Sequence, residues 1–377
     1  MSGSGSKGGR AFRGAVVRSK GGKFLLEDLT LAPPAAEEVL IKVTAAGVCH
    51  TDHIIREQYF PTPLPCVLGH EGSGIVEEVG AAVTTLKAGD RVAVTYLSCG
   101  HCPQCETGES SYCQHFFALN FGGSRMDGTT SVRDHTGSSV HDHFFGQSTF
   151  GTLAIAHQRN CVKVRDDVPL ALVGPLGCGI QTGAGAILNS FRVRSGTSVA
   201  VFGAGAVGLS AVMAARVAGA TTIIAIDVID SRLQLAKTLG ATHTLNAGRT
   251  DVVKEVQEIT KGGARYSLET SGLPKVLRQA IDAIGVRGEC GIIGAAPLGT
   301  EASFDIISHL VMGKTLRGIC EGDSQPSIFI PQLLELYLQG RFPFDKLVKY
   351  YPFAKINEAV DESLSGSTIK AILEMPA

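Results

Sequence analysis

Residues 198–208 read Ser-Val-Ala-Val-Phe-Gly-Ala-Gly-Ala-Val-Gly. The first five are mostly apolar or β-branched, which predicts a short buried strand. The next six have the spacing G-x-G-x-x-G and lead into an Ala- and Val-rich stretch that ends at Gly219, which predicts a helix. A strand, a glycine-rich turn and a helix in this order are typical of the first unit of a parallel sheet.

The same alternation continues toward the C-terminus. Short segments at residues 222–227, 265–269 and 289–294 predict further strands, and residues 231–239 between the first two predict a helix. Alternating strands and helices form a parallel sheet that is covered by helices on both faces. We therefore expect a doubly wound Rossmann domain over residues 183–323.

The glycine-rich turn has a physical explanation that involves a ligand. Gly203 permits a tight turn, Gly205 allows close approach of a pyrophosphate, and Gly208 allows helix and strand to pack closely. Asp227 ends the next strand, where an acidic side chain meets ribose hydroxyls and disfavours a 2′-phosphate. NAD is the expected cofactor, although Arg232 could reach such a phosphate. A glycine-rich turn without any cofactor is the alternative.

Four cysteines lie within fifteen residues, in the pattern C-x₂-C-x₂-C-x₇-C formed by Cys99, Cys102, Cys105 and Cys113. Four thiolates can surround one tetrahedral zinc and leave no open position, which is typical of a structural site. The spacing matches neither common iron–sulfur pattern. Disulfide pairing is the alternative, and it is disfavoured in a reducing compartment. His101, inside this segment, is not needed as a ligand.

A second set of metal-binding side chains is dispersed along the chain. It consists of Cys49 in Cys-His-Thr-Asp, His70 in Gly-His-Glu and Cys178 in Gly-Cys-Gly. Alone, each would be read as an ordinary core residue. Together they supply two thiolates and one imidazole, the Cys₂His combination of catalytic zinc sites that keep a fourth position open. The sequence thus predicts two zinc ions per chain.

The first part of the chain has a different sequence pattern. Short β-branched runs occur at residues 39–43, 74–79 and 91–95. They predict an antiparallel, barrel-like domain over residues 1–182, to which residues 324–377 return. The polar segment 107–147 is expected to be a long loop. Within it, we expect His141-Asp-His143 to be solvated or to face a second subunit.

Composition excludes several classes of protein. The 377 residues carry a net charge of −1 without a basic stripe, which argues against nucleic acid binding. No apolar run reaches the ~20 residues that span a bilayer, and residues 1–10 lack the apolar core of a secretory signal. Ten cysteines without a secretory signal indicate thiol or metal chemistry in the cytoplasm.

These motifs, in this order, resemble the zinc-containing medium-chain alcohol dehydrogenases along nearly the whole chain. The resemblance rests on residues 69–76, Gly-His-Glu-Gly-Ser-Gly-Ile-Val, on the four-cysteine segment and on residues 203–208. It implies a GroES-like β-rich catalytic domain, a Rossmann coenzyme domain, and hydride transfer between NAD and a primary alcohol or aldehyde. Pro63-Leu-Pro and Glu321-Gly-Asp-Ser are most similar to the aryl-alcohol (benzyl alcohol) and allylic terpenoid alcohol dehydrogenases.

The resemblance also implies roles for individual residues. The catalytic group comprises Thr51 as the hydroxyl that takes the alcohol proton, Asp52 as the acceptor that orients His70, Glu71 near the zinc, and His50. The expected cofactor contacts are Gly203, Gly205, Val207, Gly208, Asp227, Arg232, Thr182, His50, Lys370 and Ile293. The expected substrate channel is lined by Phe60, Tyr96, Phe144 and Phe145.

One departure from the family concerns proton release. Many members have a histidine three residues after the hydroxyl, where this chain has Ile54. If the segment is extended, adjacent side chains point to opposite faces, which favours His50 or solvent over His53 as the next proton carrier. Beyond Thr51 the relay stays open.

Other functions remain as alternatives. One is a general, polyol or formaldehyde dehydrogenase. Another is a quinone-reductase-like or non-catalytic dinucleotide-binding relative, which the intact set Cys49, His70 and Cys178 disfavours. In either case we expect a homodimer, with a tetramer as the alternative.

Overall fold

The computed structural model describes residues 9–376 and divides into two compact units. Unit 1 runs to Cys178 and includes Pro326–Pro331 and the chain from Leu347 onward; unit 2 comprises Gly179–Gln325 and Gln332–Lys346. Residues 332–346, which we expected to belong with the first domain, cluster with unit 2. They carry apolar residues such as Leu333 and Phe342, which are fully buried.

Unit 2 is built on a six-stranded sheet with the order β13-β12-β11-β14-β15-β16, and every neighbouring pair is parallel. Its strands are β11 Ser198–Phe202, β12 Thr222–Asp227, β13 His243–Asn246, β14 Ala264–Glu269, β15 Ile284–Ile292 and β16 Thr315–Gly318. Its helices are α5 Gly179–Gly185, α6 Ala206–Val217, α7 Asp230–Leu239, α8 Val252–Thr260, α9 Pro274–Asp282 and α10 Ile306–Met312.

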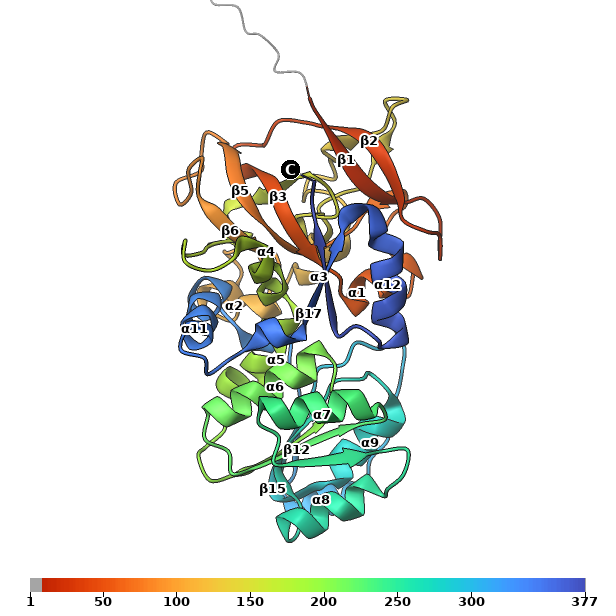
Figure 1. The fold of residues 1–377 in the computed structure, drawn as a ribbon, viewed down its shortest axis with the longest axis vertical. Helices are drawn as coiled ribbons and strands as arrows, with labels where there is room; N and C mark the ends of the chain where they lie inside the picture. The colour runs from red at the N-terminus through yellow and green to blue at the C-terminus, as the bar shows by residue number, and fades with distance from the viewer. Residues whose placement is uncertain (1–8, 377) are drawn as a thin grey trace, which may run out of the picture. The chain divides into compact units, whose positions relative to one another are not determined.

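Helices cover both faces of this sheet. Alternate residues of β11 point to opposite faces. Phe202 packs with Val252 of α8 and Ile281 of α9, whereas Val201 lies against Gly208 of α6. Figure 1 shows α7 beside β12 in the green part of the chain. The parallel, doubly wound architecture predicted from the alternation of elements is therefore correct.

Unit 1 contains two sheets, with the orders β4-β1-β2-β7-β8 and β10-β6-β5-β3-β18-β17, and β9 also pairs with β3. Its strands are β1 Arg10–Val17, β2 Leu25–Leu31, β3 Glu38–Gly47, β4 Cys66–Val67, β5 Glu71–Val79, β6 Arg91–Val94, β7 Val132–Arg133, β8 Ser139–Val140, β9 Leu153–His157, β10 Cys161–Lys163, β17 Val348–Pro352 and β18 Lys370–Glu374. Pairing is antiparallel except between β17 and β18. Figure 1 shows the blue C-terminal strands beside the orange β3.

Short helices connect these strands. They are α1 His50–Arg56, α2 Pro103–Glu106, α3 Phe116–Phe121, α4 Leu170–Val173 and α12 Ile356–Ser365; α11, Pro326–Leu338, is divided between the units. The segment 107–147 is therefore not the long loop that we predicted, because it contains α3, β7 and β8. Its end is also not solvated: Asp142 and His143 are buried.

Within residues 9–376, no single helix is both long and apolar enough to span a membrane. Only the bent pair Leu170–Gly177 and Gly179–Ser190, taken together, passes that test of length and composition.

Candidate metal and coenzyme sites

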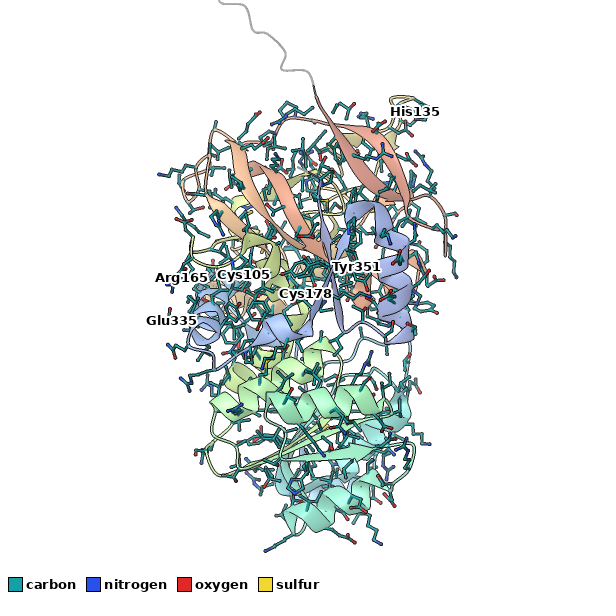
Figure 2. All side chains as sticks on the ribbon, viewed as in Figure 1. Cys105, His135, Arg165, Cys178, Glu335 and Tyr351 are labelled. Carbon is teal, nitrogen blue, oxygen red and sulfur yellow. The ribbon has the colours of Figure 1, made fainter. Side chains whose placement is uncertain are left out.

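The dispersed metal ligands of the sequence come together in unit 1. Cys49 caps the N-terminus of α1, His70 immediately precedes β5, and Cys178, labelled in Figure 2, follows the short helical turn after α4. The ligand atoms of these three residues and of Glu71 all lie within 4.8 Å of one another. The fold thus builds a Cys₂His cluster with a carboxylate beside it.

The cluster has the chemistry of a zinc site. His70 Nε2 is buried and makes no hydrogen bond of normal geometry, as expected for a nitrogen that binds a metal. Its other ring nitrogen, Nδ1, lies 3.0 Å from Asp52 Oδ1. Asp52 also accepts hydrogen bonds from the backbone of Gly69 and Cys49, at 3.1 and 2.9 Å. A carboxylate fixed in this way sets the orientation and tautomer of a metal-binding imidazole.

The Cys49 thiol lies in a field that favours the thiolate. A hydrogen bond with Cys178 and the positive charges of Lys370 and His70 outweigh burial, and they hold the pKa of Cys49 well below its ordinary value. The thiolate is the form that binds zinc.

A buried ion pair lies beside these ligands. Lys370 Nζ donates to both carboxylate oxygens of Glu71, at 2.7 and 2.8 Å, and to the carbonyl of Val48 at 3.1 Å. Burial alone would lower the pKa of Lys370, but the charges of Glu71 and Cys49 raise it. These contacts engage the ammonium group of Lys370 in the structure, and its expected contact with the pyrophosphate stays a prediction. Because the ammonium and the carboxylate are both fully buried, each must neutralise the charge of the other.

The segment after Cys49 also differs from our expectation. Residues 50–56 form α1 and are not extended, so side chains three apart share a face. The rings of His50 and His53 lie 5.5 Å apart, and the argument against His53 as a proton carrier therefore fails. Thr51 Oγ1 lies 3.6 Å from Cys49 Sγ, which places this hydroxyl next to the ligand cluster.

An aromatic wall covers the imidazole of His70. The ring centroids of Phe144 and Phe145 lie 5.1 and 4.5 Å from that of His70. The expected channel residues Tyr96 and Phe60 join the same cluster through Phe116 and Phe121. We did not predict these last two. The available signal was the run of phenylalanines at residues 116, 117 and 121, in which Phe117 and Phe121, four apart, share one side of a helix.

The four-cysteine segment forms a separate cluster. Its ligand atoms also lie within 4.8 Å of one another. The Sγ atoms of Cys99 and Cys105, and those of Cys102 and Cys113, are each 3.9 Å apart. This separation matches the ~3.8 Å expected for thiolates on a tetrahedral zinc and excludes a disulfide. Backbone N–H groups of Cys99 and His115 donate to Cys113 Sγ.

In unit 2, the glycine-rich turn is shaped for a ligand at the start of α6. Gly203 has a φ of 103°, which a residue with a side chain rarely adopts. A Cβ at Gly205 would meet nothing within 4 Å, so the space above the turn is open. Val207 and Gly208 follow in the first turn of α6. Thr270, which we did not predict, donates to the carbonyl of Phe202 and so ties β14 to the turn.

Asp227 ends β12 beside this turn. Its carboxylate accepts hydrogen bonds from the backbone of Ala204 at 2.7 Å and of Ile229 at 2.9 Å, and Arg232 lies 3.9 Å away. The other expected contacts in unit 2 have partners of their own. Thr182 donates to Glu321, and the Ile293 backbone donates to the carbonyl of Glu269.

Comparison with known proteins agrees with these features. The alcohol dehydrogenase GroES-like domain matches residues 35–166, and the zinc-binding dehydrogenase domain matches residues 206–338. A geraniol dehydrogenase of Castellaniella defragrans is 47% identical over 361 residues, which cover 95% of this chain and 96% of that protein.

Two solved structures are also similar over nearly their whole length. An alcohol dehydrogenase zinc-binding domain protein from Burkholderia ambifaria is 58% identical with a TM-score of 0.96, and covers 98% of this chain and 100% of its own. A benzyl alcohol dehydrogenase from Acinetobacter calcoaceticus is 49% identical with a TM-score of 0.95, over 97% and 100%. The chain therefore belongs to the zinc-binding alcohol dehydrogenase family, whose members combine zinc with a nicotinamide dinucleotide.

Proposed function

We propose that this protein interconverts primary aromatic or allylic alcohols, of the benzyl, cinnamyl or geranyl type, and their aldehydes. The observation that carries the proposal is the aromatic wall on His70, because the buried rings of Phe144, edge-on, and Phe145, tilted, lie directly beside a metal ligand. A planar or unsaturated substrate gains from aromatic neighbours, whereas ethanol is too small to use them. The names of the geraniol and benzyl alcohol dehydrogenases among the relatives support the same substrate class.

The surrounding residues divide the chemistry among them. When bound, the zinc makes an alcohol hydroxyl more acidic, and the dinucleotide accepts the hydride. Thr51 both donates and accepts, so its hydroxyl takes the alcohol proton and passes it on without carrying charge at rest. Asp52 fixes the imidazole of His70, and Lys370 neutralises Glu71. The aromatic side chains exclude water from the reacting carbon.

For the cofactor we propose NAD. The Asp227 carboxylate stands at the end of β12, where it favours ribose hydroxyls and repels a 2′-phosphate. We expect Asp227→Ser to narrow the preference for NAD⁺ by about tenfold, since such a charge contributes roughly 1–2 kcal/mol. Steady-state kcat/KM with NAD⁺ and NADP⁺ is the measurement. A native preference for NADP⁺ would show that Arg232 dominates.

We also propose two zinc ions per chain, a cytoplasmic location and a homodimer. The Cys₂His and four-thiolate clusters support the zinc count, and ten free cysteines suit a reducing compartment.

In unit 2, α10 exposes Ile306, Leu310 and Val311 by 72–73%, next in sequence to the sheet's edge strand β16. An apolar patch of this kind is typical of subunit contacts. Light scattering would test it, with Leu310→Glu expected to give monomers.

A substrate screen tests the central proposal. Benzyl, cinnamyl and geranyl alcohol should exceed ethanol in kcat/KM by at least ~10²-fold, because each methylene in an apolar pocket contributes ~1–3 kcal/mol. Ethanol or a polyol as the best substrate would favour the general or polyol dehydrogenase. Dinucleotide binding without zinc or turnover would favour a non-catalytic relative.

A further inference from the structure

The turn that carries the aromatic wall has an unusual backbone. His143, Phe145 and Ser148 have φ values of 59°, 53° and 53°, and Gly146 between them has 64°. Three non-glycine residues in the left-handed region within six positions do not keep that conformation unaided, because each Cβ crowds its neighbouring carbonyl. The surrounding structure must therefore hold the turn.

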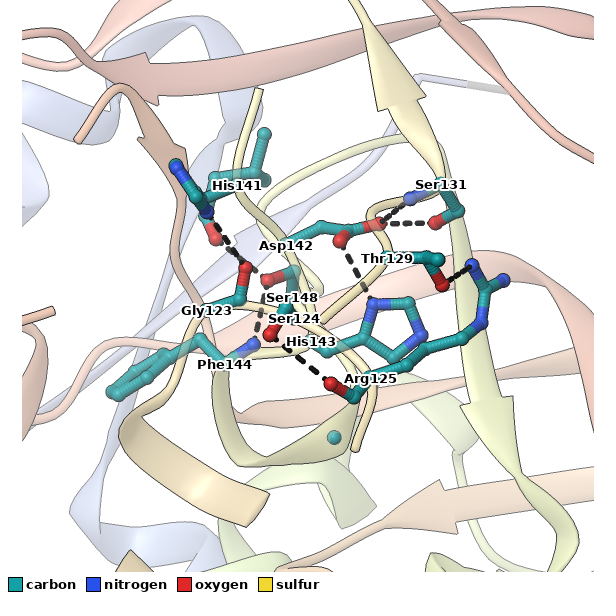
Figure 3. Close-up of polar contacts among 12 residues, drawn as sticks. Gly123, Ser124, Arg125, Thr129, Ser131, His141, Asp142, His143, Phe144 and Ser148 are labelled. Atoms are coloured by element: carbon teal, nitrogen blue, oxygen red, sulfur yellow. Dashed lines mark hydrogen bonds and ion pairs between the residues drawn. The ribbon is translucent and has the colours of Figure 1, made fainter. Parts of the chain in front are cut away.

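One side of the turn is anchored by Ser148. Its hydroxyl donates to the carbonyl of Val67 at 2.6 Å and accepts from the backbone of Phe144 at 3.0 Å. The other side is anchored by His143, which immediately precedes the two phenylalanines. Figure 3 shows its ring beside Asp142, within a group of polar contacts. The imidazole thus determines where the wall begins.

Each nitrogen of the His143 ring faces a carboxylate. Nδ1 lies 2.8 Å from Asp142 Oδ1, and Nε2 lies 3.2 Å from Glu38 Oε1. A neutral imidazole has one N–H and one lone pair, so it would turn a lone pair toward one of the two carboxylates, whereas the doubly protonated ring presents an N–H to each side. The Nδ1 contact with Asp142 is an ion pair without hydrogen-bond geometry, and Nε2 makes the hydrogen bond to Glu38. All three side chains are buried, so the charges favour an imidazolium.

The carboxylates are fixed in turn. Arg125 donates to both oxygens of Glu38, at 2.7 and 2.8 Å, and the backbone of Ala35 donates at 2.8 Å. Asp142 Oδ2 accepts from the backbone and the hydroxyl of Ser131. When His143 is charged, it and Arg125 balance the negative charges of Glu38 and Asp142.

We propose that His143, clamped between Asp142 and Glu38, is a positioning residue. It holds the Phe144–Phe145 wall against His70 and so sets the discrimination between bulky and small alcohols. The inference rests on the proposed function. His143 is distant in sequence from the metal ligands. Because its ring contacts carboxylates, it acts on the wall through the backbone of the turn.

The charge on His143 persists to alkaline pH. Burial would lower its pKa, but Asp142 and Glu38 outweigh burial and raise the pKa to about 9. The other charged or titratable groups around the clamp are Arg125 beside Glu38, His157 and Asp127 farther out, and the Cys66 thiol near Asp142. A cavity of about 510 Å³ reaches His143, Glu38 and Arg125 and gives protons access. The stabilisation that the charged His143 ring gives to the turn is complete below the ordinary histidine pKa of ~6.5, and it is lost as pH rises through about 9.

The first test is the ratio of kcat/KM for benzyl alcohol to that for ethanol. Ionisation of the alcohol affects both substrates and largely cancels in the ratio. We expect a constant ratio from neutral pH and a fall above pH about 9, with a one-proton dependence. In His143→Gln the ratio should be at least about tenfold lower and independent of pH. His141→Gln, whose ring contacts the Gly123 carbonyl, is the matched control and should behave as native. An unchanged ratio in a folded His143→Gln protein would overturn the proposal.

The second test does not depend on a variant that folds or on the substrate. In the native protein labelled with ¹⁵N-histidine, NMR should show one imidazole that stays protonated on both nitrogens up to pH about 9. If every imidazole is neutral by pH 8, the clamp is wrong. If the imidazolium is present but benzyl alcohol is not preferred, the proposed function fails and the clamp stands.

Discussion

The two metal clusters of unit 1 use similar ligands in opposite ways. The four-cysteine cluster draws all its ligands from one short segment, and its thiols are half-buried or buried near the surface. The Cys₂His cluster draws its ligands from residue 49, residue 70 and residue 178, each at the end of a different element. Around it lie a hydroxyl, a buried ion pair and an aromatic wall.

The difference teaches what each cluster can do. Four thiolates complete a tetrahedron, so no position is left for a substrate, and the metal can only hold the segment together. Three ligands leave a position open, and the supporting residues then become necessary to orient the ligands and to move a proton. Supporting chemistry, rather than the cysteines themselves, distinguishes the reactive cluster from the structural one.

The largest expected effect comes from a ligand of the open cluster. His70→Asn should reduce kcat by at least ~10³-fold, because the metal contributes several kcal/mol to the transition state. Zinc content should fall while the secondary structure, followed by circular dichroism, is retained. The exposed His135, labelled in Figure 2, gives the control His135→Asn. Substantial activity without zinc at this cluster would contradict the assignment.

Removal of the hydroxyl should have the next largest effect. Thr51→Ala should reduce kcat by ~10²-fold or more at neutral pH, because a positioned proton carrier contributes ~10²–10⁴-fold. Zinc content should stay at the native level. Thr51→Ser keeps the hydroxyl and should restore most of the activity; if it is as slow as Thr51→Ala, packing rather than proton transfer explains the role.

The orienting carboxylate should matter less than the ligand itself. Asp52→Asn should weaken zinc binding or activity by about 10–100-fold, as for other acceptors behind metal-binding histidines. Competition with a chelator measures the affinity. Asp28→Asn removes a highly exposed carboxylate and should change nothing. An unaltered zinc affinity in Asp52→Asn would mean that the backbone alone orients His70.

The smallest effect is expected near the closed cluster. His101 and His115 lie within reach of Cys99, so they could replace a thiolate. Because four thiolates already complete the tetrahedron, His101→Ala should leave zinc content and Tm unchanged within error. A loss of zinc in this variant would show that the closed cluster uses a histidine.

The sequence was most informative where a local pattern has one physical meaning. The glycine spacing at residues 203–208 directly constrains the neighbouring backbone. The four-cysteine spacing directly constrains the ligands of one metal. Both patterns lie in the structure where local geometry would place them: at the start of α6 and in one compact cluster.

It was least informative where the outcome depends on distant partners. The pairing of Glu71 with Lys370 joins residues 299 positions apart. His143 was expected to be solvated or to face a second subunit because its segment is rich in serine. It is instead buried beside Glu38, 105 residues away, whose negative charge compensates the charge of the ring. The helix α1 was missed because His50-Thr-Asp-His is a weak helical pattern that Asp52 stabilises by accepting from the backbone of Cys49.

The measurement that tests the division of labour most directly compares Cys102→Ser with Cys178→Ser. Native protein should contain two zinc ions per chain, and each variant about one. In Cys102→Ser, Tm should fall by about 6–12 °C, as a loss of ~3 kcal/mol implies, while turnover per folded molecule stays near native. In Cys178→Ser, turnover should be lost while Tm changes little. Equal effects of the two substitutions on Tm and on turnover would contradict the account.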